Sequence, residues 1–191
     1  MKKAFTMIEL VFVIVVIGIL AAIIIPSTRT NPVQEAAIDL VSKIRYTQHL
    51  AMVDDKYDRA NANWFKENWQ IEFDTGANTY SIKSGANLAR DPSNASANVK
   101  NIDLQAKYGV TVALAGTECG TAQAANAGIF ALSFDNFGRP ASGDLNSTTS
   151  AYSGTDYRLV QTDDCIITLS DSTQAARIRV RPETGYATIE P

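Results

Sequence analysis

Apolar residues follow three patterns along the chain, and each pattern predicts a different element. From Leu10 to Ile25 no residue is charged. With Phe5 to Ile8 added, the run would make a helix of roughly 30 Å, about the thickness of a bilayer's hydrocarbon core. Pro26 ends the run and marks an expected kink. This first pattern predicts a membrane-spanning helix over residues 5–26, in which Glu9 is the one charged residue.

A second, amphipathic pattern begins after Asn31, which can cap a helix whose first residue is Pro32. Apolar residues then recur every three or four positions, which predicts a helix that ends near Val53 and buries one stripe. The expected stripe consists of Val33, Ala37, Leu40, Val41, Ile44, Ala51 and Met52. Residues 5–26 and 27–54 together predict one long N-terminal helix, membrane-spanning in its first half and amphipathic in its second.

Beyond Trp64, short apolar segments alternate with turn residues, which is the pattern of antiparallel strands. Trp69–Phe73 and Thr79–Lys83 flank an Asp-Thr-Gly-Ala-Asn turn and predict a hairpin. Further strands are expected at Gly109–Leu114, Ile129–Phe134, Tyr157–Gln161, Ile166–Leu169, Ala176–Arg181 and Tyr186–Ile189. Residues 84–98 and 141–155 are rich in Ser, Asn, Gly and Ala and predict surface loops. The expected fold class is α+β, with the long helix packed on antiparallel β-sheets of a domain over residues 55–191.

Length and charge limit the classes of function. A chain of 191 residues, 46% of them hydrophobic, is long enough for one membrane helix and one modest domain. The net charge is −3, and the domain from Asp55 onward has 12 Lys and Arg against 16 Asp and Glu. A generally basic nucleic-acid-binding protein is therefore not indicated.

The charges at the N-terminus suggest an orientation for the apolar run. Lys2 and Lys3 precede it, so the positive-inside rule places the N-terminus in the cytoplasm and everything after Pro26 outside. A carboxylate in a spanning segment costs about 2–3 kcal/mol near the centre, so Glu9 is expected to have a partner. A cleavable secretory signal is the alternative, but three isoleucines, rather than a polar mature start, follow Ala21-Ala22.

The opening MKKAFTMIEL and the apolar run after it resemble the class III leader of type IV pilins and type II secretion pseudopilins. The resemblance implies that a prepilin peptidase removes leader residues 1–4 by cutting between Ala4 and Phe5, and that the new amine of Phe5 is N-methylated. Ala4 stands where the family most often has glycine. Glu9 falls where the family's glutamate pairs with the freed amine of a neighbouring subunit during assembly.

The globular part adds a weaker resemblance to the GspH/FimT type of minor pseudopilin. It rests on residues 40–45, the pair Trp64 and Trp69, residues 134–139 and residues 177–186, with Asn68 standing where a glycine is usual. The implied partners are other (pseudo)pilin subunits, the prepilin peptidase, an inner-membrane assembly platform and membrane lipid. The implied location is the bacterial inner membrane, as a single pass with a periplasmic C-terminal domain, and then the pilus or pseudopilus.

Two cysteines, Cys119 and Cys165, lie in the region that this topology places outside the cytoplasm, where disulfides persist. One bridge is the natural pairing, and closing such a loop would stabilise the domain by about 4 kcal/mol in the chain-entropy model. Two free buried thiols are the alternative. The absence of a CxxC pair and the single histidine, His49, argue against a zinc site.

Three arginines form a candidate interaction row near the C-terminus. Arg177, Arg179 and Arg181 alternate with Ile178 and Val180, so a strand would place the three guanidinium groups on one face. Such a row could contact a DNA backbone without reading sequence. Some FimT-type relatives promote DNA uptake through a basic C-terminal patch, so a DNA-binding minor pilin of a natural-transformation system is an alternative function. The acidic balance of the domain favours a solvated strand face or a subunit contact instead.

The remaining signals are few. Asp144 to Thr148 fits an extended glycosylation sequon with Asn146 as acceptor. No nucleophile elbow, phosphate-binding loop or metal-ligand spacing is found, so we expect no enzyme, no cofactor and no metal. The sequence favours a structural subunit, cleaved and methylated, that assembles as a minor component into a type II secretion pseudopilus or a type IV pilus. A bitopic membrane-anchored binding protein, which would keep Met1, is the alternative from another class.

Overall fold

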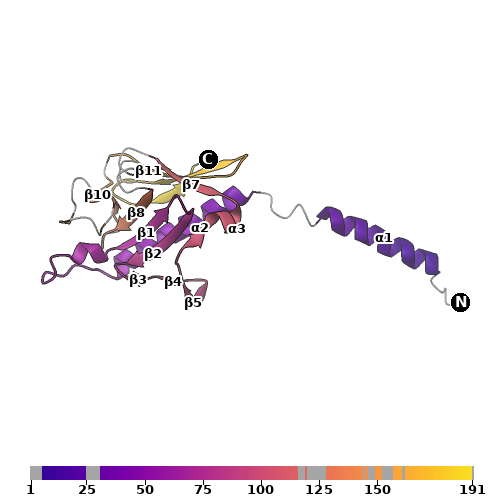
Figure 1. The fold of residues 1–191 in the computed structure, drawn as a ribbon, viewed down its shortest axis with the longest axis horizontal. Helices are drawn as coiled ribbons and strands as arrows, with labels where there is room; N and C mark the ends of the chain where they lie inside the picture. Colours follow the sequence, from indigo (N-terminus) through magenta and orange to yellow (C-terminus); the bar gives the residue numbers. More distant parts are fainter. Residues whose placement is uncertain are drawn as a thin grey trace. The chain divides into compact units, whose positions relative to one another are not determined.

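The computed structural model of the chain describes residues 6–24, 31–115, 119, 128–143, 145, 149–151, 157–160 and 162–190. The chain divides into two compact units, Met1–Pro32 and Val33–Pro191. Helix α1 (Met7–Ile24) belongs to the first unit. Helix α2 (Pro32–Val53) and the strands form the second (Figure 1). The amphipathic helix is therefore part of the β-rich domain.

The prediction of one long N-terminal helix is wrong. In the described residues α1 and α2 are separate helices of 18 and 22 residues. Asn31 is not helical, and α2 starts afresh at Pro32. Proline has no N–H to continue a preceding helix, and its ring clashes with the turn before it, so this residue favours a new start. The fold that is found is a mixed α+β fold with antiparallel sheets.

The membrane-spanning prediction is also wrong. Within the described ranges, no helix combines the length and the apolar character that a bilayer crossing requires. A spanning helix takes about 20 consecutive apolar residues. Helix α1 has 18 residues and includes Glu9. The expected transmembrane helix over residues 5–26 is thereby overturned, and with it the single pass, the inner-membrane location and the periplasmic placement of the domain.

Two antiparallel sheets build the second unit. In the described residues the larger sheet has seven strands in the order β10-β9-β8-β1-β2-β3, with β6 also paired to β2. The smaller has the order β13-β12-β11-β7, and β4 and β5 form a separate hairpin. The larger sheet comprises β1 (Trp69–Asp74), β2 (Thr79–Ser84), β3 (Asn87–Leu88), β6 (Ile102–Asp103), β8 (Ile129–Phe134), β9 (Pro140–Gly143) and β10 (Tyr157–Leu159). The smaller comprises β7 (Thr111–Ala115), β11 (Cys165–Ser170), β12 (Ala175–Val180) and β13 (Ala187–Ile189).

The predicted hairpin is confirmed as β1 and β2. Their register pairs Ile71 with Ile82 and Phe73 with Tyr80, so four large side chains share the buried face. The prediction of a loop over residues 84–98 is wrong, because β3, β4 (Arg90–Asp91) and β5 (Asn94–Asn98) lie there. Strand β5 is mostly exposed and therefore lacks the apolar alternation that marks a strand in sequence. The short helices η2 (Trp64–Glu67) and α3 (Leu104–Tyr108) complete the described elements.

Helix α2 contributes one side of a core that it shares with both sheets. Its buried residues are Val33, Ala36, Ala37, Leu40, Val41, Lys43, Ile44, Thr47 and Ala51. Met52, expected in the stripe, is instead 48% exposed. Polar contacts fix the helix on two sides: Tyr46 donates to the carbonyl of Arg90, and Arg45 donates to that of Ala187 in β13. The domain thus holds α2 by packing and by hydrogen bonds to its neighbours.

Candidate functional site

Helix α1 begins with a hydrogen-bonded cap. The amide of Glu9 donates to Thr6 Oγ1 at 3.4 Å and to the Thr6 carbonyl oxygen at 3.1 Å. Thr6 is thus the N-cap, and Glu9 stands at the third helical position, which is the spacing of a capping box. A carboxylate there is also favoured by the positive end of the helix dipole. The Thr-x-x-Glu spacing of Thr6 and Glu9 is a sequence signal for this cap, although the apolar pattern alone did not predict it.

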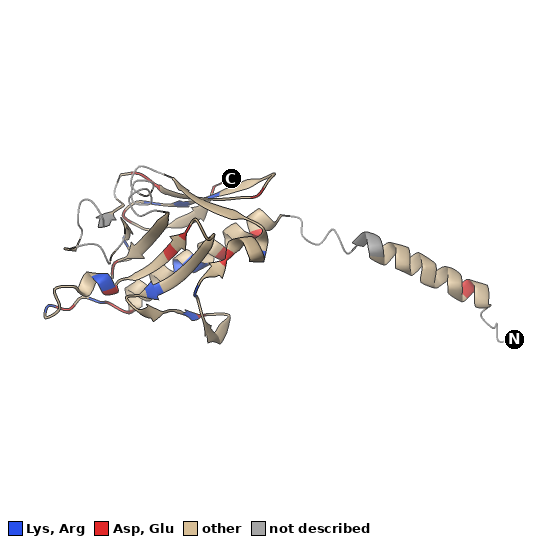
Figure 2. Cartoon of the chain, in the orientation of Figure 1, with Lys and Arg blue, Asp and Glu red and all other residues tan. Residues whose placement is uncertain are grey.

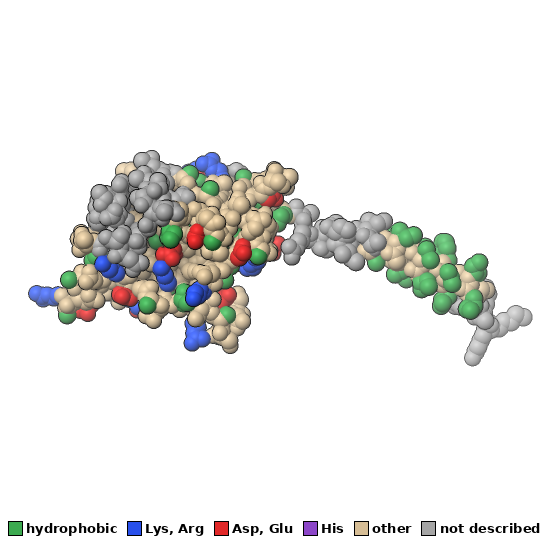
Figure 3. All heavy atoms as spheres, viewed as in Figure 1, with side chains coloured by type: hydrophobic (Ala, Val, Ile, Leu, Met, Phe, Trp, Pro, Cys, Tyr) green, Lys and Arg blue, Asp and Glu red, His purple; other side chains and the backbone are tan. Residues whose placement is uncertain are grey.

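The surface of α1 is apolar on every side. Each described side chain from Thr6 to Ala21 is exposed, including Phe12, Ile14 and Ile17. Figure 3 shows green hydrophobic side chains along the helix, and Figure 2 shows red near its N-terminal end, where Glu9 is the acidic residue of the first turn. A helix that is hydrophobic all round is normally a buried helix. This surface therefore requires cover that its own unit does not supply.

Several candidate residues lie outside the described residues. They are Ala4 and Phe5 at the expected cleavage and methylation site, Pro26 at the expected kink, and Asn146 in the glycosylation sequon. Their assignments stay predictions.

The three arginines lie as the alternation predicted. Ile178 and Val180 of β12 are fully buried, while Arg177 and Arg181 are exposed and Arg179 is partly exposed. In Figure 2 the ribbon near the C-terminus is coloured for residues of both charges. Arg181 follows the last residue of β12. The structure thus brings the three side chains together on the outer face of the smaller sheet.

Two carboxylates form ion pairs with the three arginines of this row. Glu190 pairs with Arg177 at 3.4 Å and makes a close ion pair with Arg179. Asp164 lies 3.0 Å from Arg179 Nη1 and 3.5 Å from Arg181 Nη1. The hydrogen bond to Glu190 raises the pKa of Arg179. A phosphate that approached the row would have to compete with both carboxylates, which weakens the case for a DNA backbone contact.

The sequence alone did not indicate Asp164 and Glu190 as partners of the arginines. Arg179 faces Thr188 across the β12–β13 pair, so Glu190 comes within reach of two arginines only in that register. The register depends on the turn between the strands, and the chain shows no hairpin signal of the Asn-Gly kind there.

Cys119 and Cys165 form a disulfide with a Cα–Cα distance of 5.5 Å, and both residues are fully buried. Cys165 is the first residue of β11, a central strand of the smaller sheet. The bridge joins positions 46 residues apart, so it constrains a long loop of the unfolded chain.

The segment 134–139 that supports the family resemblance forms a stiff turn. Asp135 is 1% exposed, and its carboxylate accepts hydrogen bonds from the amides of Phe137 and Arg139 and from Arg139 Nε at 2.7 Å. Gly138 has a φ of 78°, a conformation that favours glycine. These hydrogen bonds and the positive φ of Gly138 explain the residues of this segment as those of a tight turn.

The described residues contain no group of three or more His, Cys, Asp or Glu arranged to hold a metal ion. Comparisons of the chain with protein-family models, with curated proteins and with solved structures find no match. The function must therefore be inferred from the molecule's own surfaces.

Proposed function

We propose that this chain is a structural subunit of a filament of the type IV pilin or type II secretion pseudopilin kind. In this proposal a prepilin peptidase removes residues 1–4, the new N-terminus at Phe5 is methylated, and α1 packs against α1 of other subunits. The domain over Val33–Pro191 then forms the outer part of the filament.

The observation that carries the proposal is the exposed apolar surface around the whole of α1. Burying a Leu, Ile, Val or Phe side chain is worth about 1.5–3 kcal/mol relative to exposure, so several such residues supply a strong drive to associate. A single apolar stripe would suit a dimer. Apolar residues on every side suit a bundle of several helices, and head-to-tail contacts between copies give an open helical filament when the rotation does not close.

Glu9 supplies specificity within that bundle. An unpaired carboxylate between apolar helices is costly, whereas one that meets a positive group is compensated. The freed amine of a neighbouring Phe5 would be such a group, close to the N-terminal end of each helix. Pairing with it would fix how far one subunit is shifted along the next. The resemblance of MKKAFTMIEL to a class III leader supports this assignment.

The test compares Glu9→Ala with the unchanged chain in a cell that has a pilin-processing protease and an assembly system. The expected result is normal chain abundance with incorporation into sheared filaments reduced about tenfold or more, because an unpaired terminal amine remains in the apolar bundle. Incorporation is measured by immunoblot of the filament fraction, and mass spectrometry of that fraction should find an N-methylated Phe5.

Glu35→Ala is the matched control. Glu35 is an exposed carboxylate in the first turn of α2, and its removal should leave incorporation unchanged. Full incorporation of Glu9→Ala would contradict the pairing. A chain that keeps Met1 in such a cell would contradict the filament function itself.

A further inference from the structure

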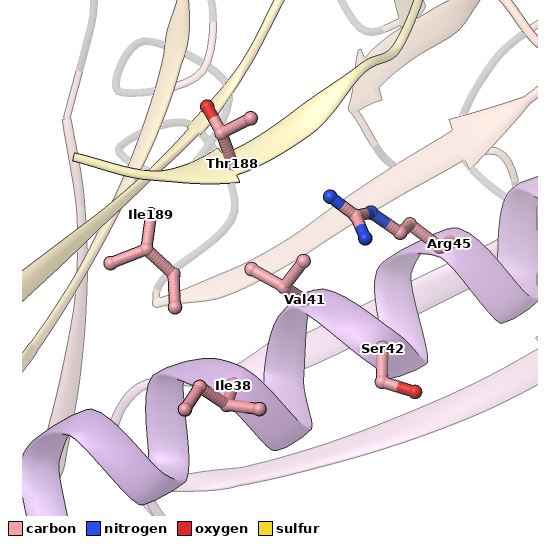
Figure 4. Close-up of a pocket in the computed structure, with 6 residues that line it drawn as sticks. All are labelled: Ile38, Val41, Ser42, Arg45, Thr188 and Ile189. Carbon is pink, nitrogen blue, oxygen red and sulfur yellow. The ribbon is translucent and has the colours of Figure 1, made fainter.

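An open groove lies between helix α2 and strand β13. Its cavity has a volume of about 490 Å³ and is lined by Ile38, Val41, Ser42 and Arg45 from the helix and by Thr188 and Ile189 from the strand. Figure 4 shows Ile189 pointing toward α2, while the Thr188 hydroxyl points away from it. Ile38 is 58% exposed, although it lies on the same helix as nine buried residues. The groove therefore leaves a large apolar side chain in contact with solvent.

The exposed side of α2 beside this groove has the spacing of a helix-packing surface. Five exposed residues follow one another at alternating steps of four and three positions: Ile38, Ser42, Arg45, His49 and Met52. Such steps keep residues on one side of a helix, and they are the repeat with which helices pack along one another. The row therefore suits a second helix that lies along α2.

Helix α1 is a helix of the same chain whose surface requires cover. Its described side chains are exposed and apolar on every side, apart from Glu9 near its N-terminal end. Gly18 is the one glycine of α1, and a Cβ built on it would have nothing within 4 Å. Glycine inside a helix costs about 1 kcal/mol relative to alanine, and its lack of a side chain lets a partner approach closely. Gly18 thus marks a place on α1 where a large side chain of a partner fits.

The spacing of charged and apolar residues matches between the two helices when they run antiparallel. Glu9 lies nine residues before Gly18 in α1, which is about 13 Å along the helix. Arg45 and His49 lie seven and eleven residues after Ile38 in α2, which is about 10 and 16 Å. If Gly18 faces Ile38, the carboxylate of Glu9 therefore reaches a level between two basic side chains. A parallel arrangement would instead place Glu9 beyond the start of α2 at Pro32.

Arg45 and Glu9 are also complementary in charge. The Arg45 guanidinium donates to the Ala187 carbonyl at 2.8 Å and lies 5.6 Å from the centre of the Tyr186 ring. In the described part of the chain, no carboxylate lies within ion-pair distance of Arg45, and no cation lies within that distance of Glu9. A guanidinium has five N–H donors, so donors remain for a carboxylate. An ion pair beside an apolar contact fixes the register, because a shifted helix would leave its carboxylate against apolar side chains.

From these observations we propose that α1 of one copy of the chain binds along α2 of a second copy, antiparallel to it, in the groove beside β13. Gly18 faces Ile38, and Glu9 pairs with Arg45. Two copies that exchange their helices in this way form a closed pair with two identical contacts. Glu9 cannot pair with Arg45 and with a neighbour's terminal amine at once, so the pair is a form that the chain adopts outside a filament. The contact itself does not depend on the proposed filament function.

The first test is disulfide crosslinking between copies. Full-length Gly18→Cys and Ile38→Cys chains are mixed in the lowest concentration of mild non-ionic detergent that keeps them in solution, and are then oxidised. A product of twice the chain mass should form in the mixture and in neither variant alone. Val11→Cys mixed with Ile38→Cys is the matched control, because Val11 lies on the same side of α1 but about 10 Å from Gly18, too far for a disulfide. The native cysteines are already joined and fully buried.

The second test exchanges the two charges. In sedimentation experiments the unchanged chain should form dimers, and Glu9→Arg should weaken the association about tenfold or more, because two guanidinium groups then face each other. Adding Arg45→Glu to Glu9→Arg should restore the dimer. Such a rescue separates the ion pair from any effect of Arg45 on folding. Adding Arg177→Glu instead is the control and should restore nothing, since Arg177 does not line the groove.

Four results would overturn the inference. The first is no more crosslinking in the mixture than in the Val11 control. The second is unchanged association of Glu9→Arg. The third is crosslinking of Gly18→Cys chains with one another, which would indicate parallel α1 helices and would agree with a filament. The fourth is a crosslink confined to single chains that carry both Gly18→Cys and Ile38→Cys. The filament function is tested separately by the processing of Met1, so either proposal can fail without the other.

Discussion

Helices α1 and α2 are of similar length, yet their surroundings differ completely. In α2 nine side chains are buried, and several of these are fully inaccessible. In α1 every described side chain is exposed, although the helix is the more apolar of the two. The more apolar helix is thus the less buried one, so apolar composition alone does not determine burial.

The difference shows where each helix obtains its stability. Helices of this length are marginal in water unless an apolar face is packed. The domain supplies that packing for α2 through the core shared with both sheets. For the described part of α1, the side-chain hydrogen bond is local, at the Thr6 cap. Its proposed stabilisation comes from other subunits, and the two helices should therefore respond differently to the same kind of change.

Removing the disulfide should have the largest effect, and on the domain alone. Replacing both Cys119 and Cys165 by Ala should lower the free energy of unfolding of the domain by about 4 kcal/mol, since a long loop regains its freedom. Urea unfolding followed by Trp64 and Trp69 fluorescence measures this. Helicity of α1, which belongs to the other unit, should not change. A double variant as stable as the unchanged chain would show that the bridge adds nothing to the domain that holds α2.

A matched pair of leucines tests the comparison directly. Leu40→Ala in α2 should lower the free energy of unfolding by about 3 kcal/mol, because Leu40 is fully buried and its removal leaves a cavity. Leu20→Ala in α1 should change it by about 0.5 kcal/mol or less, because Leu20 is 53% exposed. Chemical denaturation measures both. Equal losses in the two variants would break the distinction between the helices.

The sequence predicted those parts of the fold whose pattern is local. The α2 stripe placed Leu40 and Ile44 in the core, and the turn after Phe73 placed the β1–β2 hairpin. Alternation also placed Arg177 and Arg179 on the solvent side of β12. In each case, periodicity determines which side of an element is buried.

The predictions that were wrong or incomplete concern features that a local pattern does not determine: where an apolar helix ends, a strand without alternation, and contacts between distant residues. The apolar run after Glu9 predicted a spanning helix that joins α2, whereas α1 is a separate helix of 18 residues. The polar strand β5 has no alternation to reveal it. The site residues Asp164 and Glu190 come together with the arginines only through strand register, which the local sequence does not specify.

An ion pair between Lys43 of α2 and Asp91 of β4 provides a further test of how the domain stabilises α2. Lys43 is 7% exposed, and its ammonium lies 3.1 Å from an Asp91 oxygen. Asp91→Asn should lower the free energy of unfolding by about 2 kcal/mol, because a largely buried cation loses its carboxylate. Glu35→Gln, at an exposed site on the same helix, should have little effect. Denaturation at pH 7 compares the two, and equal stability of Asp91→Asn and the unchanged chain would show the pair to be unimportant.

The same pair predicts a pH dependence. The amide of Ser93, and then Lys43, hold the pKa of Asp91 below its ordinary value. The unfolded chain therefore binds a proton at higher pH than the folded chain does. The stabilisation is complete above the ordinary pKa of about 4 and is lost as pH falls through the lower folded pKa. Asp91→Asn should flatten this decline in unfolding curves recorded between pH 7 and pH 3.

The smallest expected effect concerns the cap of α1. Thr6→Ala removes the side-chain oxygen that accepts from the Glu9 amide, which should destabilise the first turn by about 1 kcal/mol. Hydrogen exchange of the Glu9 and Leu10 amides in detergent should then accelerate about fivefold, since 1 kcal/mol corresponds to that factor in an opening equilibrium. Thr6→Ser retains the hydroxyl and is the control. If exchange in Thr6→Ala stays at the rate of the unchanged chain, then contacts other than this cap hold the start of α1, and the contrast with α2 narrows at that end of the helix.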